Sequence, residues 1–165
     1  MKPRSTPDLI WEYNMNDIEV VFLDMDNTIA ENRTSRDICY YKGMYIEKRP
    51  IQIMIEAIKE FYIDRGIPVI VLSKTKGGID GKREKVDWLN ACVDYDLAGI
   101  ILIEDQRKVN IIREWCIDNK VKLNRVLIID DNKQTLQECC DAGIYAKYPQ
   151  QLICDYEEIH NINRR

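Results

Sequence analysis

The chain has 165 residues, of which 45% are hydrophobic, so it is long enough and apolar enough for one domain with a well-formed core. Its net charge of −4 argues against stable nucleic-acid binding, and its best apolar run, Ile67–Leu72, is too short to span a membrane. Six cysteines without a Cys-x-x-Cys pair, and an amino end without the apolar run of a signal peptide, predict reduced thiols in a cytoplasmic protein.

The first part of the chain predicts one buried strand followed by a polar insert. A short helix is expected at Pro7–Tyr13, and Ile18–Asp24 has the β-branched and large apolar residues of a strand that is buried on both faces. The polar, tyrosine-bearing segment Ala30–Lys48 is expected to form a loop or a small hairpin. A helix then begins at Pro50, because proline suits a first helical turn, and it ends at Gly66.

The middle of the chain predicts two more strands, each followed by a helix. The apolar run Pro68–Ser73 is the second strand, and a loop rich in glycine and lysine, Lys74–Lys82, leads from it to a helix at Arg83–Val93. The third strand is expected at Ala98–Ile103. Lys108 opens the next helix, whose apolar residues recur at helical spacing.

The last part of the chain continues the alternation with a strand at Arg125–Asp130, a helix at Gln134–Asp141 and a short strand at Ile144–Lys147. Strands that alternate with helices imply βαβ units with right-handed crossovers. The sequence therefore predicts a doubly wound, Rossmann-like α/β fold with a parallel sheet, formed by a single domain over residues 1–165.

Polar side chains follow several of the predicted strands, where each strand ends. They are Asp24, Asp26, Ser73, Lys108, Asp130 and Asp131. The carboxyl ends of parallel strands meet at one edge of a sheet, so these side chains are expected in one crevice. Carboxylates without histidine or cysteine partners suit Mg²⁺ better than Zn²⁺, and a hydroxyl and a lysine beside them suit a phosphoryl group. Because His160 is the only histidine and lies near the tail, histidine-based catalysis is not expected.

The acidic residues after the first and fourth predicted strands also have a purely local explanation. Asp26 and Asn27 are ordinary turn residues that could close the first strand. Asp130 and Asp131 could cap the helix that follows them and complement its dipole. Their recurrence at successive strand ends favours a shared site over separate turns and caps.

The segment Asp24-x-Asp26-x-Thr28 resembles the first motif of the haloacid dehalogenase-like (HAD) phosphohydrolases, and the order and strand context of the later polar residues match that family over most of the chain. The resemblance implies that Asp24 is the nucleophile and forms a phosphoaspartyl intermediate. It implies that Asp26 protonates the leaving group and then activates water. It also implies a sheet with strand order 5-4-1-2-3.

The remaining motifs of the family fall on later residues. By the same resemblance Ser73 is the second motif, Lys108 the third, and Asp130-Asp131 the fourth. The Mg²⁺ ligands implied are Asp24, the backbone carbonyl of Asp26, Asp130 and Asp131. The substrate contacts implied are Thr28, Ser73, Lys74 and Lys108.

The third motif has a competing assignment. Lys85, in the pattern Lys85-x-x-Trp88 after the second strand, could take the place of Lys108. Lys108 is favoured because it precedes the strand that carries the metal-binding acids. The pattern is closest to the 5′-nucleotidase-like branch and to the capless magnesium-dependent and FkbH-like branches.

Only a short flap, residues 29–49, stands where nucleotidases have a helical cap. Its tyrosines Tyr40, Tyr41 and Tyr45 could stack on a nucleobase, or they could anchor the flap to the domain. The resulting expectation is a Mg²⁺-dependent phosphomonoester hydrolase with an open site for a small phosphorylated substrate, with nucleoside monophosphates favoured if the tyrosines stack. A larger substrate or a neighbouring subunit could cover the site. The alternatives are a non-catalytic module that binds a phosphorylated ligand, and a phosphotransferase with an acceptor other than water.

Overall fold

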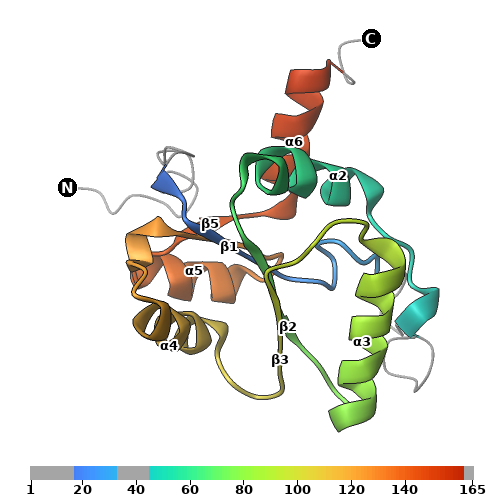
Figure 1. Cartoon of the computed structure of the whole chain (residues 1–165), viewed down its shortest axis with the longest axis horizontal. Coiled ribbons are helices and arrows are strands. Elements are labelled where there is room, and N and C mark those ends of the chain that lie inside the picture. The colour runs from blue at the N-terminus through green and yellow to red at the C-terminus, as the bar shows by residue number, and fades with distance from the viewer. Residues whose placement is uncertain (1–16, 33–44, 162–165) are drawn as a thin grey trace.

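The computed structural model describes residues 17–32 and 45–161. In this part of the chain, five strands form one parallel sheet in the order β3-β2-β1-β4-β5, which confirms the predicted order (Figure 1). The strands are β1 Val20–Leu23, β2 Val69–Lys74, β3 Gly99–Ile103, β4 Val126–Ile129 and β5 Tyr145–Lys147. The helix expected at residues 7–13 lies outside the described residues.

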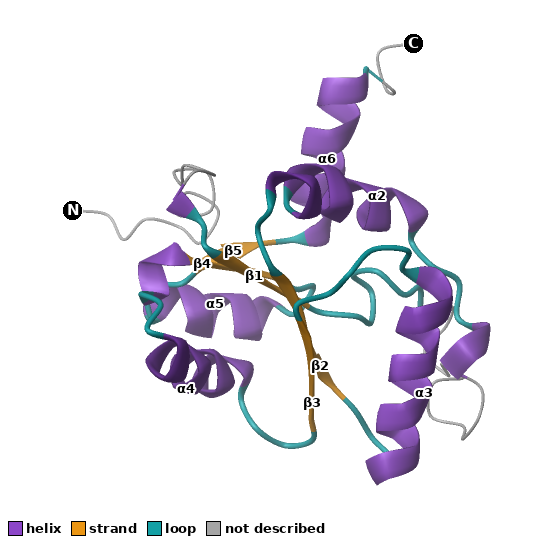
Figure 2. Ribbon diagram, viewed as in Figure 1, coloured by secondary structure: helices purple, strands orange, loops and turns teal. Residues whose placement is uncertain are grey.

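Helices cover both faces of the sheet (Figure 2). They are α2 Gln52–Phe61, α3 Gly78–Cys92, α4 Lys108–Asn119, α5 Lys133–Asp141 and α6 Pro149–His160. The helices α2, α3 and α6 contribute to the hydrophobic core on one face, whereas α4 and α5 contribute to the core on the other. The fold is therefore the doubly wound α/β sandwich that the sequence predicts.

The central strand β1 is apolar throughout because both of its faces are buried. Val21 and Leu23 lie in the core that contains α2, while Val20 and Phe22 lie in the core that contains α4. Side chains alternate between the two faces of a strand, so a strand between two helical layers needs apolar residues at every position. This burial fixes β1 in register between β2 and β4.

The helix α3 begins at Gly78, five positions before its predicted start, so part of the expected glycine-rich loop is helical. Gly77 caps the helix with a φ of +88°, a backbone conformation that favours glycine. At Gly81 a Cβ atom would lie 2.0 Å from the carbonyl oxygen of Lys76, so only glycine fits. The glycines therefore allow the chain to turn tightly from β2 into α3.

The helix α6 was not among the elements predicted from the sequence. Pro149 occupies its first turn, Leu152 is buried, and Ile153 and Tyr156 pack against the core on the α2 side of the sheet. Apolar residues at positions 152, 153 and 156 have helical spacing and were the available signal. None of the helices in the described ranges combines the length and the apolarity needed to cross a bilayer.

The two ends of the predicted flap pair with each other. Ala30 and Pro50 form an antiparallel bridge, the amide of Glu31 donates to Arg49 at 2.8 Å, and the amide of Ile51 donates to Ile29 at 2.7 Å. This pairing joins the two ends of the insert, and Tyr45–Glu47 forms a short 3-10 helix within it. Residues 33–44, which include Tyr40 and Tyr41, lie outside the described part of the chain.

The five cysteines in the described residues are free thiols. Cys116 and Cys139 are buried in the core on the α4 side of the sheet, while Cys154 is exposed. The sixth cysteine, Cys39, lies outside the described residues.

Candidate active site

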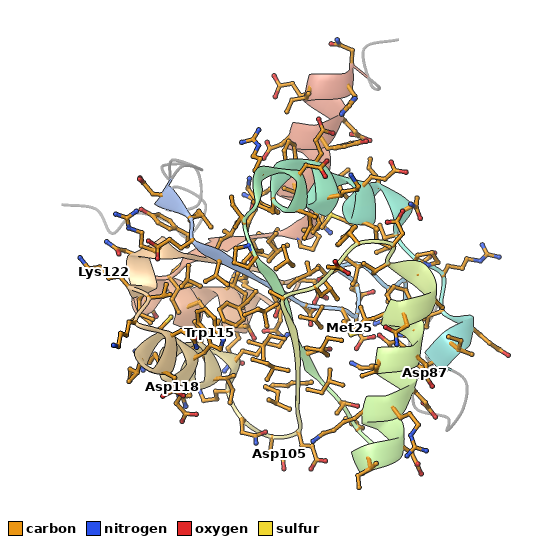
Figure 3. The ribbon with its side chains drawn as sticks, in the orientation of Figure 1. Met25, Asp87, Asp105, Trp115, Asp118 and Lys122 are labelled. Carbon is orange, nitrogen blue, oxygen red and sulfur yellow. The ribbon has the colours of Figure 1, made fainter. Side chains whose placement is uncertain are left out.

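The predicted polar side chains lie together at the carboxyl edge of the sheet. They surround a cavity of about 230 Å³, here called the inner cavity, that opens between the ends of β1, β2 and β4. Its lining includes Asp24, Asp26, Ser73, Lys74, Lys108, Asp130 and Asp131. Met25, which lies between Asp24 and Asp26 in the chain, is labelled in the side-chain view (Figure 3). The juxtaposition expected from strand ends is confirmed.

Lys108 connects the two buried acids of the site. Its Nζ atom lies 2.7 Å from an oxygen of Asp24 and 2.7 Å from an oxygen of Asp130, and all three side chains are almost completely buried. Burial by itself would lower the pKa of Lys108, but the two carboxylates outweigh it and hold this pKa above its ordinary value. The lysine is therefore a fixed positive charge between two carboxylates.

The acids Asp24, Asp130 and Asp131 form a group that could hold a metal ion. Each offers one carboxylate oxygen, and these oxygens lie within 4.8 Å of one another. Burial, and then the charge of Asp24, raise the pKa of Asp130, and the same two causes raise the pKa of Asp131 to about 7. Raised pKa values mean that negative charge is crowded here, and a hard all-oxygen site of this kind fits Mg²⁺.

Lys85, the alternative third-motif lysine, also reaches the site. Its Nζ lies 2.8 Å from Asp26, 2.9 Å from the hydroxyl of Ser73 and 2.6 Å from the carbonyl of Lys74. Lys108 therefore pairs with Asp24 while Lys85 pairs with Asp26. The sequence posed the two lysines as alternatives, and the structure brings both to the site, one from α4 and one from α3.

Tyr45 and Lys48 hold Asp26 from the base of the flap, and sequence reasoning predicted neither contact. The hydroxyl of Tyr45 and the ammonium of Lys48 each donate to the same oxygen of Asp26 at 2.8 Å. Burial would raise the pKa of Asp26, but the charge of Lys85 and the hydrogen bonds from both lysines outweigh it and hold this pKa below its ordinary value. No local sequence pattern indicated Lys48, because its contact with Asp26 depends on how the base of the flap packs against the domain.

The position of Tyr45 decides between its two expected roles. Its side chain is buried, and its ring packs edge to face against Trp88 with centroids 6.2 Å apart. The indole of Trp88 also donates to the backbone carbonyl of Lys48 at 2.9 Å. Tyr45 therefore anchors the flap to α3, and nucleobase stacking on this tyrosine was the wrong interpretation.

Thr28 is fully buried, and its hydroxyl donates to Asp24 at 3.0 Å. It does not line the inner cavity, so the expectation that Thr28 contacts substrate is corrected: its side chain positions Asp24. Asn27, at a φ of +58°, turns the chain sharply after Asp26. Of the other expected contacts, Ser73 and the exposed Lys74 do line the cavity.

Asn132 supports the acidic group from the start of α5. The backbone amide of Asn132 donates to the carboxylate of Asp130 at 2.9 Å. The side-chain oxygen of Asn132 accepts from the backbone amide of Thr135 at 2.9 Å. The helix cap is therefore made by Asn132, which leaves the carboxylates of Asp130 and Asp131 facing the inner cavity. The interpretation of the two acids as mere helix caps is not supported by this geometry.

Comparison with known proteins supports the fold. No family model and no curated protein matches the chain. The N-terminal part of a Bacteroides fragilis protein containing a phosphatase domain, complexed with Mg, has a TM-score of 0.58 at 20% identity, over 88% of this chain and 40% of that one. A cobalt-bound deoxy-D-mannose-octulosonate 8-phosphate phosphatase from Haemophilus influenzae has a TM-score of 0.55 at 18% identity, over 81% of this chain and 70% of that one.

A third similar structure is a HAD family enzyme from Bacteroides thetaiotaomicron in complex with magnesium and inorganic phosphate. Its TM-score is 0.56 at 10% identity, over 79% of this chain and 93% of the other. At these identities the likeness establishes a shared fold. The present chain spans less than half the length of the Bacteroides fragilis structure.

Proposed function

We propose that this protein is a Mg²⁺-dependent phosphomonoester hydrolase of the haloacid dehalogenase-like type. The observation that carries the proposal is the pairing of two acids with two lysines at the carboxyl edge of the sheet, Lys108 with Asp24 and Lys85 with Asp26. A carboxylate nucleophile and a phosphate repel each other, so the reaction needs fixed positive charge on both sides of the attacking oxygen.

Asp24 is the proposed nucleophile. One of its oxygens attacks phosphorus and forms a phosphoaspartyl bond, while the bond from phosphorus to the leaving oxygen breaks and that oxygen takes a proton from Asp26. Water then attacks the phosphorus of the intermediate and gives its proton to Asp26, which releases inorganic phosphate and restores Asp24. Thr28 and Lys108 hold Asp24 in place for both steps.

Asp26 must carry a proton when the leaving group departs, whereas in the ligand-free site its pKa lies below the ordinary value. A bound phosphate brings negative charge next to Lys85 and competes for its hydrogen bonds with Asp26. Both effects raise the pKa of Asp26. Substrate binding thus prepares the acid for its first step.

The cofactor of the proposed reaction is Mg²⁺, which Asp24, Asp130, Asp131 and the backbone carbonyl of Asp26 would hold. The three carboxylates fit this ion because they crowd negative charge that Lys108 only partly offsets. When bound, Mg²⁺ supplies positive charge that offsets the charge of the phosphate.

The decisive experiment is turnover of p-nitrophenyl phosphate with Mg²⁺ and with EDTA. Release of inorganic phosphate only with Mg²⁺ supports the hydrolase. Mass spectrometry of acid-quenched protein should then find a phosphoryl group on the peptide that contains Asp24. Binding of phosphate without turnover would instead indicate a non-catalytic module, and turnover that requires an added alcohol would indicate a phosphotransferase.

A further inference from the structure

A second cavity adjoins the inner one on the side of α3. This outer cavity has a volume of about 300 Å³, and it shares Asp26, Asn32 and Lys74 with the inner cavity. The two cavities therefore meet at Asp26, the residue to which the proposed function gives the proton for the leaving oxygen.

The position of Asp26 indicates which part of the substrate would occupy the outer cavity. With phosphorus beside Asp24, the leaving oxygen points to Asp26, and the group attached to that oxygen extends past Asp26. The space beyond Asp26 is the outer cavity, which is enclosed by the start of α3 and by the loop between β3 and α4. Its volume is at the lower end for ligand pockets, so it suits a small leaving group.

The lining of the outer cavity is rich in charged groups of both signs. Lys74 is the last residue of β2, Lys76 follows that strand, and Glu84 lies on α3. Glu104 and Asp105 come from the loop after β3, at which Asp105 is labelled in Figure 3. A hydroxyl group can donate to a carboxylate and accept from an ammonium, so a ligand with several hydroxyls matches a wall of mixed charge.

The same wall disfavours a nucleobase. None of the described residues that line the outer cavity is a valine, leucine, isoleucine or methionine. Its aromatic residue, Tyr45, is only 2% exposed and packs on Trp88, so its ring offers no face for stacking. A planar base would therefore find no aromatic ring to stack on among the described residues that line this cavity.

We propose that the outer cavity is a leaving-group subsite for a small polyhydroxylated group, such as a monosaccharide, and that Glu104 and Asp105 help to select it. This inference rests on the proposed function, because it takes Asp24 as the point of attack. It goes beyond that function in naming the substrate class: sugar or polyol phosphates in preference to nucleoside monophosphates.

The test compares kcat/KM for glucose 6-phosphate, adenosine 5′-monophosphate and p-nitrophenyl phosphate, with Mg²⁺. The first two are both esters of primary alcohols, so their ratio reports the subsite. We expect glucose 6-phosphate to exceed adenosine 5′-monophosphate about tenfold or more, since one charge-assisted hydrogen bond contributes about that factor. The double variant Glu104→Gln, Asp105→Asn should lower the ratio of glucose 6-phosphate to p-nitrophenyl phosphate by about tenfold.

The matched control is Glu114→Gln, Asp118→Asn, two exposed acids on α4, of which Asp118 lies well away from Asp105 (Figure 3). This variant should keep the wild-type ratio. If p-nitrophenyl phosphate is not hydrolysed at all, the proposed function fails. If it is hydrolysed but adenosine 5′-monophosphate is the better alkyl substrate, or the Glu104 and Asp105 variant keeps the wild-type ratio, the subsite alone is overturned.

Discussion

Lys108 and Asp24 are 84 positions apart in the chain, yet the ammonium of one lies 2.7 Å from the carboxylate of the other. The same ammonium lies 2.7 Å from Asp130, at the end of the neighbouring strand β4. Three elements, β1, α4 and β4, thus supply one charge cluster at the edge of the sheet. The contacts of Lys108 with Asp24 and Asp130 are the basis of the first two predictions.

Asp24→Asn should abolish hydrolysis of p-nitrophenyl phosphate while the protein stays folded. The amide is nearly isosteric with the carboxylate, but it is not an anionic nucleophile and it is a poor Mg²⁺ ligand. The measurement is phosphate release together with the circular dichroism spectrum and the melting temperature. Retention of more than a few per cent of wild-type activity would rule out Asp24 as the nucleophile.

Lys108→Ala should reduce kcat by about 10²–10³, the usual loss when one preorganised electrostatic donor is removed. The sequence alone favoured Lys108 over Lys85 as the third-motif lysine, which would make the effect of Lys85→Ala much smaller. The three polar contacts of Lys85 at 2.6–2.9 Å change that expectation, so Lys85→Ala should also reduce kcat substantially. Steady-state kinetics on both variants provides the comparison.

The matched control for the two lysines is Lys59→Ala. Lys59 lies on α2 and forms an ion pair with Asp64, and its side chain is 47% exposed. Removal of this side chain should therefore leave kcat close to wild type. A normal kcat for Lys108→Ala combined with a large loss for Lys85→Ala would show that Lys85 is the third-motif lysine.

Mg²⁺ affinity should strengthen as the pH rises from about 6 to about 8, because metal ions bind the ionised carboxylate. Asp131 has a pKa of about 7, so a proton competes with the metal over this range. The measurement is isothermal titration with Mg²⁺ at several pH values. Asp131→Asn should bind Mg²⁺ more weakly and with a flatter pH dependence, and an equally steep dependence in this variant would show that another group titrates.

The raised pKa of Asp131 also predicts how the stability of the metal-free protein depends on pH. Because the pKa of folded Asp131 is raised above the ordinary 3.8, its contribution to stability is fully present below pH 3.8 and is lost as the pH rises through about 7. In EDTA, Asp131→Asn should therefore raise the melting temperature relative to wild type more at about pH 8 than at about pH 5. A difference that does not change with pH would contradict this assignment.

Gly81→Ala should lower both the stability and the activity of the protein. Its Cβ would lie 2.0 Å from the carbonyl of Lys76, so the start of α3 must shift and Lys85 with it. Overpacking of this kind typically lowers the free energy of unfolding by about 1–3 kcal/mol. Denaturant unfolding of Gly81→Ala and Gly99→Ala provides the matched pair, because a Cβ at Gly99 would meet only Ile70 at an ordinary 3.6 Å. Equal stabilities of the two variants would contradict the close approach at Gly81.

Local pattern was sufficient for the strands and for most of the helices. The apolar residues of β1 predicted a strand buried on both faces, and the alternation of elements predicted the parallel sheet. It was insufficient at α3, where the glycines that usually indicate a loop form the first turn of a helix. The reason is that Gly77 is required by its positive φ and Gly81 by a close backbone approach, which depends on how the chain turns from β2 into α3.

The sequence by itself determined the chemical composition of the site. Because strands end at one edge of a parallel sheet, the residues at the carboxyl ends of β1, β2 and β4 had to gather there, and Asp24, Ser73 and Asp130 do so. The tertiary structure alone decided how they pair. Lys48 and Tyr45 reach Asp26 only because Trp88 holds the flap against α3. Such contacts join side chains from elements distant in the chain, and packing, which no local pattern encodes, sets which charges face each other.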